Sequence, residues 1–288
     1  MPELTQPQID SFIHDGYLVI EEAFPPKDLA PLISEFSASV DRNASTAQRA
    51  GLITNRCEDA PFETRLASIL ASAPVREMAD APNSVLYEGI RGKLKSPAMF
   101  GIMTHPGLLD IVESLIGPEI LAHPQFNVRA KLPNQDRSVV PWHQDLGYLE
   151  LEAEDTFMVN FWLPLIDATN ENGCLEVIPG SHHTYINHVE GLGPAGNFKG
   201  VADNELPLGE PVCCPVPKGG VLLIQHRTIH RSVPNITNQV RWSLDLRYSD
   251  PALPTGRADT PGFIARSKQD PGKVALSLED WIAQSSSQ

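Results

Sequence analysis

The sequence has few cysteines. The four, Cys57, Cys174, Cys213 and Cys214, form no C-x-x-C pair, and adjacent cysteines such as the last two rarely bridge each other. This pattern predicts neither a disulfide framework nor a structural zinc site. Unpaired cysteines are typical of a reducing compartment, so we expect the protein to be cytoplasmic.

Basic charge is also scarce. The chain has 22 lysines and arginines against 36 aspartates and glutamates, which gives a net charge of −14. Nucleic acids and anionic membranes are bound through clustered Lys and Arg, so neither is an expected partner. No apolar run approaches a membrane span, and the N-terminus lacks the basic and apolar regions of a signal peptide. We therefore expect a small-molecule substrate and a monomer or homodimer.

Proline and glycine, by contrast, are plentiful, with 26 and 20 residues spread through the chain. This distribution predicts many turns and loops rather than a helical bundle. The length of 288 residues suits one large β domain or two small ones. Because the chain has no internal repeat and no low-complexity linker, we expect a single domain over residues 1–288.

The first 120 residues show helical periodicity and are expected to form a mainly helical scaffold. Thr5 and Gln8 have the spacing of a capping box, and Gly16 is a natural stop before a short strand at 17–20. Apolar residues at helical spacing predict further helices over about 26–40, 62–71 and 106–116. Residues 43–60 are polar and are predicted to be irregular.

After Gly117 the pattern changes to period two. Alternating segments at 126–132, 157–163 and 240–247, with an apolar run at 221–224, predict an antiparallel sandwich or barrel. One face of these strands mixes polar residues with Trp162, which favours a barrel with a polar, ligand-holding interior over a solvent-facing sheet. The Gly/Pro-rich stretch at about 184–210 is predicted to be a loop or lid, and the tail at 251–272 to cover the barrel mouth.

The candidate metal ligands begin with His143 and Asp145, two residues apart in a segment that is predicted to be a strand. Alternation along a strand puts both side chains on the same face. With His230 as a third ligand they would form the facial triad of two histidines and one carboxylate that is typical of non-haem Fe(II) oxygenases. A His-x-Asp pair often arises by chance in a chain with nine histidines, so the pair alone is a weak signal.

Several motifs in a fixed order make the signal specific. They are Gly16-Tyr17-Leu18-Val19-Ile20, His143-Gln144-Asp145, Trp162, the run from Asp167 to Leu175, Val177-Ile178-Pro179-Gly180-Ser181-His182, and His230-x-Ser-x-x-Asn235 leading to Arg241. Together they resemble the phytanoyl-CoA dioxygenase family of Fe(II)- and 2-oxoglutarate-dependent oxygenases over most of the chain.

The resemblance implies a mainly β fold with flanking helices, the double-stranded β-helix or cupin-like jelly-roll barrel. Residues 121–250 would form this core with its lid, and residues 251–288 would be a C-terminal tail. By motif position His143, Asp145 and His230 would hold Fe(II). Arg241 would bind the C5 carboxylate of 2-oxoglutarate, a role that suits its planar and permanently charged guanidinium.

Further residues would line the cosubstrate pocket by the same resemblance. Trp162 and Asn127 match positions that touch the cosubstrate in relatives, with packing in the barrel interior as the alternative. Ser243 shares a strand face with the cosubstrate arginine. Lys131 or Arg129 would add positive charge, or else would lie at a solvated strand edge.

The implied reaction couples the conversion of 2-oxoglutarate and O2 to succinate and CO2 to the oxidation of an unactivated C–H bond. Asp145 argues for hydroxylation, desaturation or a related oxidation, because related halogenases replace this carboxylate with a small residue. Nothing basic and extended indicates coenzyme A recognition, so we expect a small-molecule metabolite as substrate. Two alternatives are a non-catalytic cupin-like binding protein and a zinc-dependent barrel enzyme, and Arg241 argues against both.

The remaining histidines carry less signal. His226, four residues before His230, either supports the site or is structural. His182 and His183 follow a Pro-Gly-Ser turn and are expected to have a hydrogen-bonding role there. No signal attaches to His14, His105, His123 and His188.

Overall fold

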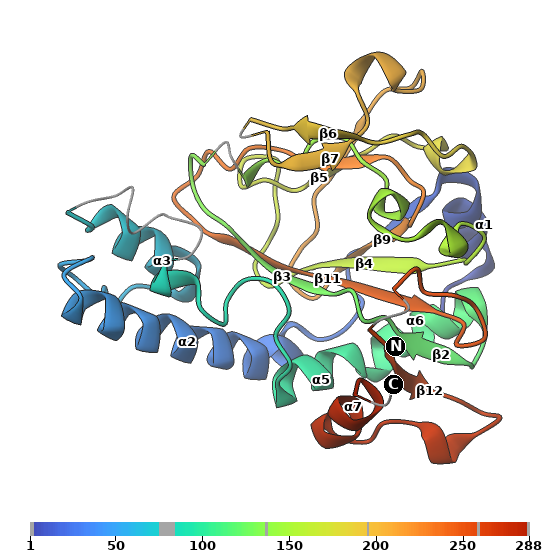
Figure 1. Cartoon of the computed structure of the whole chain (residues 1–288), viewed down its shortest axis with the longest axis horizontal. Coiled ribbons are helices and arrows are strands. Elements are labelled where there is room, and N and C mark those ends of the chain that lie inside the picture. Colours follow the sequence, from blue (N-terminus) through green and yellow to red (C-terminus); the bar gives the residue numbers. More distant parts are fainter. Residues whose placement is uncertain (1–2, 75–83, 136–137, 195, 258–259, 287–288) are drawn as a thin grey trace.

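The alternating segments form two antiparallel sheets that face one another, with helices outside the larger sheet (Figure 1). The computed structural model describes residues 3–74, 84–135, 138–194, 196–257 and 260–286. The larger sheet has the strand order β1-β9-β4-β11-β2-β12, and β3 pairs with a different stretch of β11. Its strands are β1 (Tyr17–Ile20), β2 (Ile120–Ala122), β3 (Asn127–Lys131), β4 (Val159–Pro164), β9 (Val221–Gln225), β11 (Arg241–Ser249) and β12 (Phe263–Arg266).

The smaller sheet has the order β10-β5-β8. Its strands are β5 (Leu175–Val177), β8 (Val212–Cys214) and β10 (His230–Ser232). An isolated bridge between His143 and His230 extends this sheet by one residue pair. Within the described chain the two sheets do not join into a closed barrel, but their facing arrangement is that of a jelly roll. The predicted mainly β fold with flanking helices is confirmed.

Strand β11 separates an apolar side of the molecule from a polar side. Its even-numbered residues, among them Trp242 and Leu244, have no exposed surface and belong to the main hydrophobic core. Leu244 pairs with Leu163 of β4 on one side and with Val128 of β3 on the other, so three strands contribute to the same apolar layer. The odd-numbered Arg241 and Arg247 point instead into the space between the sheets.

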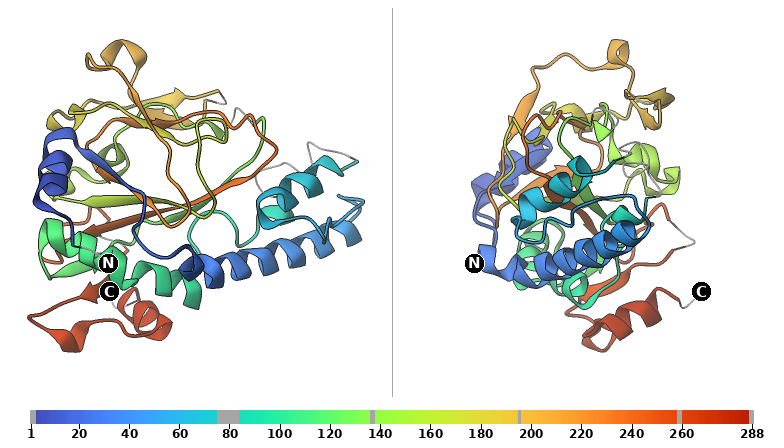
Figure 2. Two further views of the ribbon diagram at one scale, coloured as in Figure 1. Left: turned by 180° about the vertical axis from the view of Figure 1, so that it is seen from behind. Right: turned by 90° about the vertical axis from the view of Figure 1, so that its left-hand side faces the viewer.

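Helices cover the outer face of the larger sheet and bury its apolar residues (Figures 1 and 2). They are α2 (Ala30–Arg49), α3 (Phe62–Ala71), α5 (Pro97–Met103) and α6 (Pro106–Ile116). Trp242 stacks against Phe36 of α2 and Phe62 of α3, with ring centroids 5.8 Å and 4.9 Å away. The helices predicted over 62–71 and 106–116 are therefore confirmed, whereas α5 was not predicted.

Helix α2 is longer than its apolar periodicity indicates. A short 3-10 turn, η1 (Pro26–Leu29), precedes it, and it continues to Arg49, so the irregular assignment was wrong for residues 43–49. Asn43 is buried and donates hydrogen bonds to the carbonyl groups of Leu86 (3.3 Å) and Glu88 (2.7 Å). The polar residues here therefore do not mark an irregular, solvent-exposed segment, because Asn43 is buried within the helix and has two backbone partners.

Helix α1 (Gln6–Asp15) begins and ends where the sequence predicts. The Gln8 side chain accepts a hydrogen bond from the backbone N–H of Thr5 (2.9 Å), which completes the capping box. Gly16 has a φ of +79°, and a Cβ atom there would lie 2.3 Å from Nδ1 of His182 and 2.5 Å from Oγ1 of Thr228. Glycine therefore allows α1 to turn into β1 close to these two residues.

The apolar stretch Pro97–Ile116 is long and apolar enough to cross a membrane by length and composition. The expectation that no run approaches a membrane span was therefore wrong on these two criteria. In the structure the stretch is divided between α5 and α6, which are separated by Thr104 and His105, and half of it is buried inside the protein. It serves here as part of the helical layer beneath the larger sheet (Figure 1).

The stretch at 184–210 contains a hairpin of β6 (Val189–Leu192) and β7 (Phe198–Gly200). The hairpin lies on the side of the molecule that is opposite to α2 and α5 (Figure 1). Just after it, the backbone N–H of Val201 donates a hydrogen bond to the carbonyl of Trp142 (2.7 Å). The hydroxyl of Tyr148 donates to the carbonyl of Lys199. The hairpin is thus bonded to the chain on either side of His143 and Asp145.

Short 3-10 turns complete the connections. They are η2 (Val85–Tyr87), η4 (Asp145–Tyr148), η5 (Leu151–Ala153), η6 (Ser181–His183), η7 (Asp203–Glu205) and η8 (Pro271–Lys273).

The C-terminal tail meets its prediction only in part. Gly256, in the stretch predicted to cover the barrel mouth, accepts a hydrogen bond from the backbone N–H of Glu150 (3.1 Å), but the chain from Phe263 onward lies elsewhere. Strand β12 pairs with β2 at the edge of the larger sheet, and helix α7 (Leu278–Gln284) follows it. Trp281 of α7 is buried against Phe263 and Phe126, with ring centroids 5.2 Å and 5.4 Å away. Both elements lie on the side of the molecule away from the hairpin (Figure 1). A four-residue strand and a seven-residue helix are too short for periodicity to reveal.

Trp242→Ala should lower the free energy of unfolding by about 3–5 kcal/mol, because it removes a large side chain with no exposed surface. Trp242→Phe should cost roughly half of that or less, because Phe can keep the ring stacking and the indole N–H has no partner among the described residues. Urea denaturation followed by circular dichroism measures both. Equal losses would show that ring stacking is not what the core requires here.

Candidate active site

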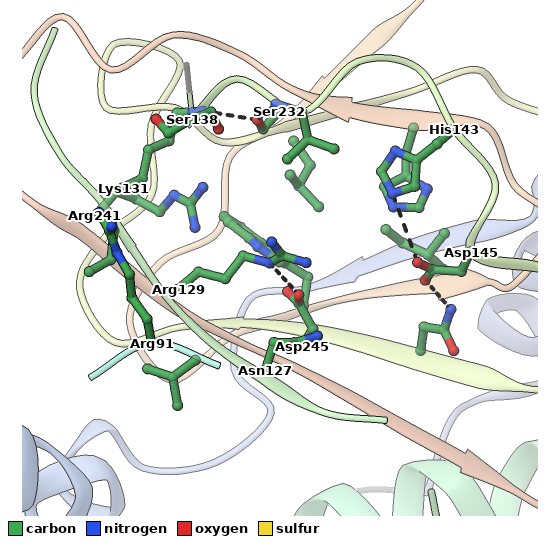
Figure 3. Close-up of a pocket in the computed structure, with 18 of the residues that line it drawn as sticks. Arg91, Asn127, Arg129, Lys131, Ser138, His143, Asp145, Ser232, Arg241 and Asp245 are labelled. Carbon is green, nitrogen blue, oxygen red and sulfur yellow. Dashed lines mark hydrogen bonds and ion pairs between the residues drawn. The ribbon is translucent and has the colours of Figure 1, made fainter. Parts of the chain in front are cut away.

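A cavity of about 420 Å³ lies between the two sheets. Strands β3, β4 and β11 supply one wall, β10 and the segment around His143 supply the other, and Phe198 enters from the hairpin. His143 and Asp145 lie at one end of the cavity, and Arg241 and Lys131 lie at the other (Figure 3). The polar interior that the strand pattern predicts is therefore present.

His143, Asp145 and His230 lie together, with one ligand-type atom from each within 4.8 Å of the others. The predicted strand at 141–145 is wrong, because Asp145 already begins the 3-10 turn η4 and only His143 makes a β-bridge. The turn brings the Asp145 carboxylate back toward its neighbour, so that Oδ1 is 3.8 Å from Nε2 of His143. The three residues meet even though the local geometry differs from the prediction.

Backbone carbonyl groups orient both imidazole rings. Nδ1 of His143 is 3.0 Å from the carbonyl oxygen of Pro141, and Nδ1 of His230 is 2.9 Å from that of Thr228. These bonds place a proton on each Nδ1, so Nε2 is the nitrogen of each ring that is turned to the site. Burial, followed by the neighbouring His230, lowers the pKa of His143 to about 3, so the ring of His143 is neutral at physiological pH.

Two residues that the sequence analysis did not single out hold Asp145. Nη2 of Arg247 donates to Oδ1 (2.7 Å), and Nδ2 of Asn160 donates to Oδ2. Burial alone would raise the pKa of Asp145, but Arg247, through its charge and its hydrogen bond, together with the neighbouring His230 and His143, keeps this pKa below its usual value. Arg247 could have been found from its sequence, because it shares the odd-numbered face of β11 with Arg241.

Arg241 is 2% exposed and is fixed by its neighbours. Its Nε donates to the carbonyl of Gly173 (3.1 Å), Nη1 donates to Oγ of Ser243, and the guanidinium carbon lies 5.0 Å from the centre of the Trp162 ring. Burial lowers the pKa of Arg241 to about 10, which still leaves it charged at neutral pH. The predicted grouping of Arg241, Ser243 and Trp162 is therefore present in the structure.

Lys131 is buried, with 4% of its surface exposed, so it does not lie at a solvated strand edge. Its Nζ donates to Oγ of Ser232 (2.9 Å). Burial, followed by the nearby charges of Arg241 and Arg129, lowers the pKa of Lys131 to about 6. The side chain can therefore gain a proton, and a positive charge, when an anion enters the cavity.

Arg129 and Asn127 also line the cavity, from the same face of β3 as Lys131. Asn127 pairs with Asp245 of β11 in the sheet register. The Nε of Arg129 donates to Oδ2 of Asp245, and this ion pair lies between the metal-type residues and Arg241 (Figure 3). Neither its acidic partner nor its central position could be seen from the sequence, because the pair joins two strands.

The histidines outside the triad do not line the cavity. The carbonyl of His226 accepts a hydrogen bond from Leu146 (2.9 Å), and burial lowers the pKa of the His226 ring to about 4, so a structural role fits best. Nε2 of His182 is 3.0 Å from the carbonyl oxygen of Ile13, so this turn residue bonds to the end of α1. His188, to which no role was assigned, accepts from the backbone N–H of Gln144 (2.8 Å).

The donor set fits a divalent iron ion. Two imidazole nitrogens and one carboxylate, clustered on one side, are the ligands of non-haem Fe(II) centres with open coordination positions. The cavity begins beside these three groups, which leaves room for ligands that do not come from the protein. The buried arginine and lysine at the far end can bind a carboxylate.

Comparison with known families supports the same reading. The family model described as Phytanoyl-CoA dioxygenase (PhyH) matches residues 12–243. The human peroxisomal phytanoyl-CoA dioxygenase is 24% identical over 253 residues, which cover 85% of this chain and 68% of that protein. The phytanoyl-CoA dioxygenase domain-containing protein 1 of Danio rerio is 34% identical over 150 residues, and the match covers 50% of each chain. The chain thus spans about half the length of several curated relatives that it matches.

Solved structures share the fold. The non-haem monooxygenase ThoJ in its apo form matches with a TM-score of 0.59 at 20% identity, over 96% of this chain and 94% of that one. The epimerase SnoN, in complex with Fe3+, alpha ketoglutarate and nogalamycin RO, matches with a TM-score of 0.56 at 20% identity, over 88% and 87% of the two chains. At this level of identity the likeness concerns the fold alone.

Gly173→Ala should lower the free energy of unfolding for two reasons, backbone strain at a positive φ of +95° and steric overlap with neighbouring atoms. A Cβ atom there would lie 2.8 Å from Cδ and Cε of Lys131 and 2.9 Å from the carbonyl oxygen of Val233. Gly51→Ala is the matched control, because it has a φ of +73° with no described atom within 4 Å, and it should cost about 1–2 kcal/mol. Urea denaturation of both variants measures the difference, and equal losses would contradict close packing at Gly173.

Proposed function

Because the chain belongs to the phytanoyl-CoA dioxygenase family of Fe(II)- and 2-oxoglutarate-dependent dioxygenases, we propose that it oxidises an unactivated C–H bond of a small-molecule metabolite. Its cofactors are those of the family, Fe(II) with 2-oxoglutarate and O2 as cosubstrates. Membership of this family sets aside the alternatives of a non-catalytic binding protein and a zinc-dependent enzyme. We assign hydroxylation, desaturation or a related oxidation as the reaction, because Asp145 is present.

One observation carries the assignment of the site. Two histidines and one carboxylate meet at one end of a cavity, and a buried arginine stands at the other end (Figure 3). We assign His143, Asp145 and His230 as the ligands of Fe(II). When bound with 2-oxoglutarate and O2, the iron supplies the oxidising power for the C–H bond, while succinate and CO2 are released.

The chain prepares the metal site before metal binds. The carbonyl groups of Pro141 and Thr228 hold a proton on each Nδ1, so that the Nε2 atoms of His143 and His230 are the nitrogens that face the site. Arg247 keeps Asp145 ionised, and its hydrogen bond fixes the direction of the carboxylate. Iron therefore need not displace a proton from His143 or Asp145 at neutral pH.

The other end of the cavity is assigned to the cosubstrate. Arg241 binds the C5 carboxylate of 2-oxoglutarate. The carbonyl of Gly173 and the hydroxyl of Ser243 fix its guanidinium, and no carboxylate of the described residues accepts a hydrogen bond from it. Trp162 supports the face of this guanidinium. Lys131 contributes a second positive charge once protonated, and Asn127 adds a polar contact from the wall.

The proposal treats residues 1–288 as one oxygenase domain. The main hydrophobic core draws its buried residues from nearly the whole chain, from Leu4 to Trp281, which supports a single domain. The free cysteines support a cytoplasmic location. A monomer or a homodimer remains the proposed state in solution.

Anaerobic addition of Fe(II) and 2-oxoglutarate should produce a weak charge-transfer absorption band in the visible region. Admission of O2 should then release succinate, which can be measured enzymatically. The band should not appear when 2-oxoglutarate is replaced by succinate, which has no keto group. The proposal is wrong if the folded wild-type protein binds Fe(II) but shows no band with 2-oxoglutarate.

Arg241→Met should weaken 2-oxoglutarate binding by about 10–100-fold, because it removes a charge-assisted hydrogen bond, and should leave Fe(II) affinity within about twofold. Arg247→Met, on the same face of the same strand, is the matched variant. It should weaken Fe(II) binding by about 10–100-fold, because it removes the partner of Asp145. Anaerobic titrations measure both constants, and the same pattern of losses in the two variants would contradict the division of roles.

Lys131 should make 2-oxoglutarate binding depend on pH. With a pKa of about 6 it is mostly neutral in the free protein above that pH, and a bound carboxylate favours its charged form. Affinity should therefore fall as pH rises from about 6 to 8, by up to about tenfold per unit. Calorimetry of the Fe(II)-loaded protein in two buffers of different ionisation enthalpy counts the proton taken up. Lys131→Arg should abolish this uptake, and an unchanged uptake would place the titrating group elsewhere.

A further inference from the structure

The cavity carries an excess of positive charge that the metal and cosubstrate do not use up. Five basic residues line it against two acidic ones, in a chain whose net charge is −14. They are Arg91, Arg129, Lys131, Arg241 and Arg247, with Asp145 and Asp245. Basic residues are therefore concentrated where the chain as a whole is acidic.

The charges in the cavity can be counted group by group with Fe(II) and 2-oxoglutarate bound, so the count rests on the proposed function. The two charges of Fe(II) are offset by the two carboxylates of 2-oxoglutarate. Asp145 offsets Arg247, and Asp245 offsets Arg129. Arg241 lies against a carboxylate of 2-oxoglutarate, but both carboxylates are already counted against Fe(II). The whole set without Arg91 therefore keeps one net positive charge, and two when Lys131 is protonated. The cavity therefore favours one more anion.

The geometry points to the place where this anion binds. Arg129 is tied through Nε to Asp245, and no described residue accepts a hydrogen bond from its two terminal nitrogens. Its side chain is 45% exposed, and it lies within the wall of the cavity rather than on the outer surface (Figure 3). Arg129 thus presents two N–H-bearing nitrogens to the cavity, the arrangement that binds a carboxylate bidentately.

Arg241 and Arg129 are suited to different ligands. Arg241 is buried and is hydrogen bonded through two of its nitrogens to the protein, which suits one cosubstrate in one position. Arg129 is the more accessible of the two and lies closer along the cavity to the metal-type residues (Figure 3). The charge of Asp145 contributes to raising the pKa of Arg129, after the larger effect of Asp245, which agrees with this position.

We propose that Arg129, positioned by Asp245, anchors a carboxylate of the primary substrate, so that the substrate is a small organic acid or amino acid. An exposed ion pair adds little to stability, so fold stability alone gives little reason to place one inside the cavity. The volume of about 420 Å³ lies near the lower end of the range for ligand pockets, roughly 300–1,000 Å³, and 2-oxoglutarate takes part of it.

The test uses the Fe(II)- and 2-oxoglutarate-loaded protein and a panel of matched compounds. The panel contains the proteinogenic amino acids and common mono- and dicarboxylic acids, each with its carboxamide. Anaerobic binding is read from changes in the charge-transfer band and in tryptophan fluorescence, and turnover is read from succinate released above the uncoupled rate. At least one acid should bind and stimulate succinate release, and its carboxamide should bind at least tenfold more weakly.

Variants then locate the anchor. Arg129→Gln should weaken binding of that acid at least tenfold. The ratio of acid affinity to carboxamide affinity should fall to about one, and the 2-oxoglutarate band should stay as in the wild type. Arg129→Lys should recover part of the preference. Arg49→Gln, at the exposed end of α2, is the matched loss of an arginine and should change nothing.

Three results would overturn the inference. They are a panel in which no acid binds, an acid that binds Arg129→Gln as tightly as the wild type, and a loss in Arg129→Gln that falls on 2-oxoglutarate instead. Failure of the proposed function looks different, because the wild-type protein would then show no 2-oxoglutarate band before any panel compound is added.

Discussion

The alternation of side chains along β11 is the constraint on which both the core and the site depend. Successive residues of a strand point to opposite faces, so one nine-residue segment supplies Trp242 and Leu244 to the helical side and Arg241 and Arg247 to the cavity. A shift of one residue would exchange the two sets. The two ends of the site are therefore held at a fixed separation by the same hydrogen-bonded strand that holds the core together.

Burial sets the protonation states of the metal-type residues in the direction that a metal requires. A desolvated carboxyl tends to stay protonated, yet Asp145 remains ionised because Arg247 lies against it. The same desolvation keeps His143 neutral, with its pKa near 3. The hydrogen bonds and the electrostatics of the site thus agree, which is the condition for a preorganised centre.

Linked motifs made most of the site predictable from sequence. His143, Asp145, His230 and Arg241 could be named because their motifs stand in a fixed order, and Ser243 because it shares a strand face with Arg241. The strands around them could be named because alternation over five or more residues is a strong local signal. The strand assignment at His143 and Asp145 was wrong, since a 3-10 turn gives the same two-residue approach by a different route. The pairing of Arg129 with Asp245 and the docking of α7 depend on tertiary contacts, and these leave little trace in local patterns.

The hairpin of β6 and β7 is hydrogen bonded to the segment that carries His143 and Asp145. Val201, just after it, is bonded to the carbonyl of Trp142, and Lys199 within it accepts from Tyr148. These contacts lie directly before His143 and three residues after Asp145 in the chain. Any outward movement of this hairpin to admit a larger molecule would pull on the segment that carries two of the three metal-type residues. The hairpin and the metal-type residues are thus mechanically linked.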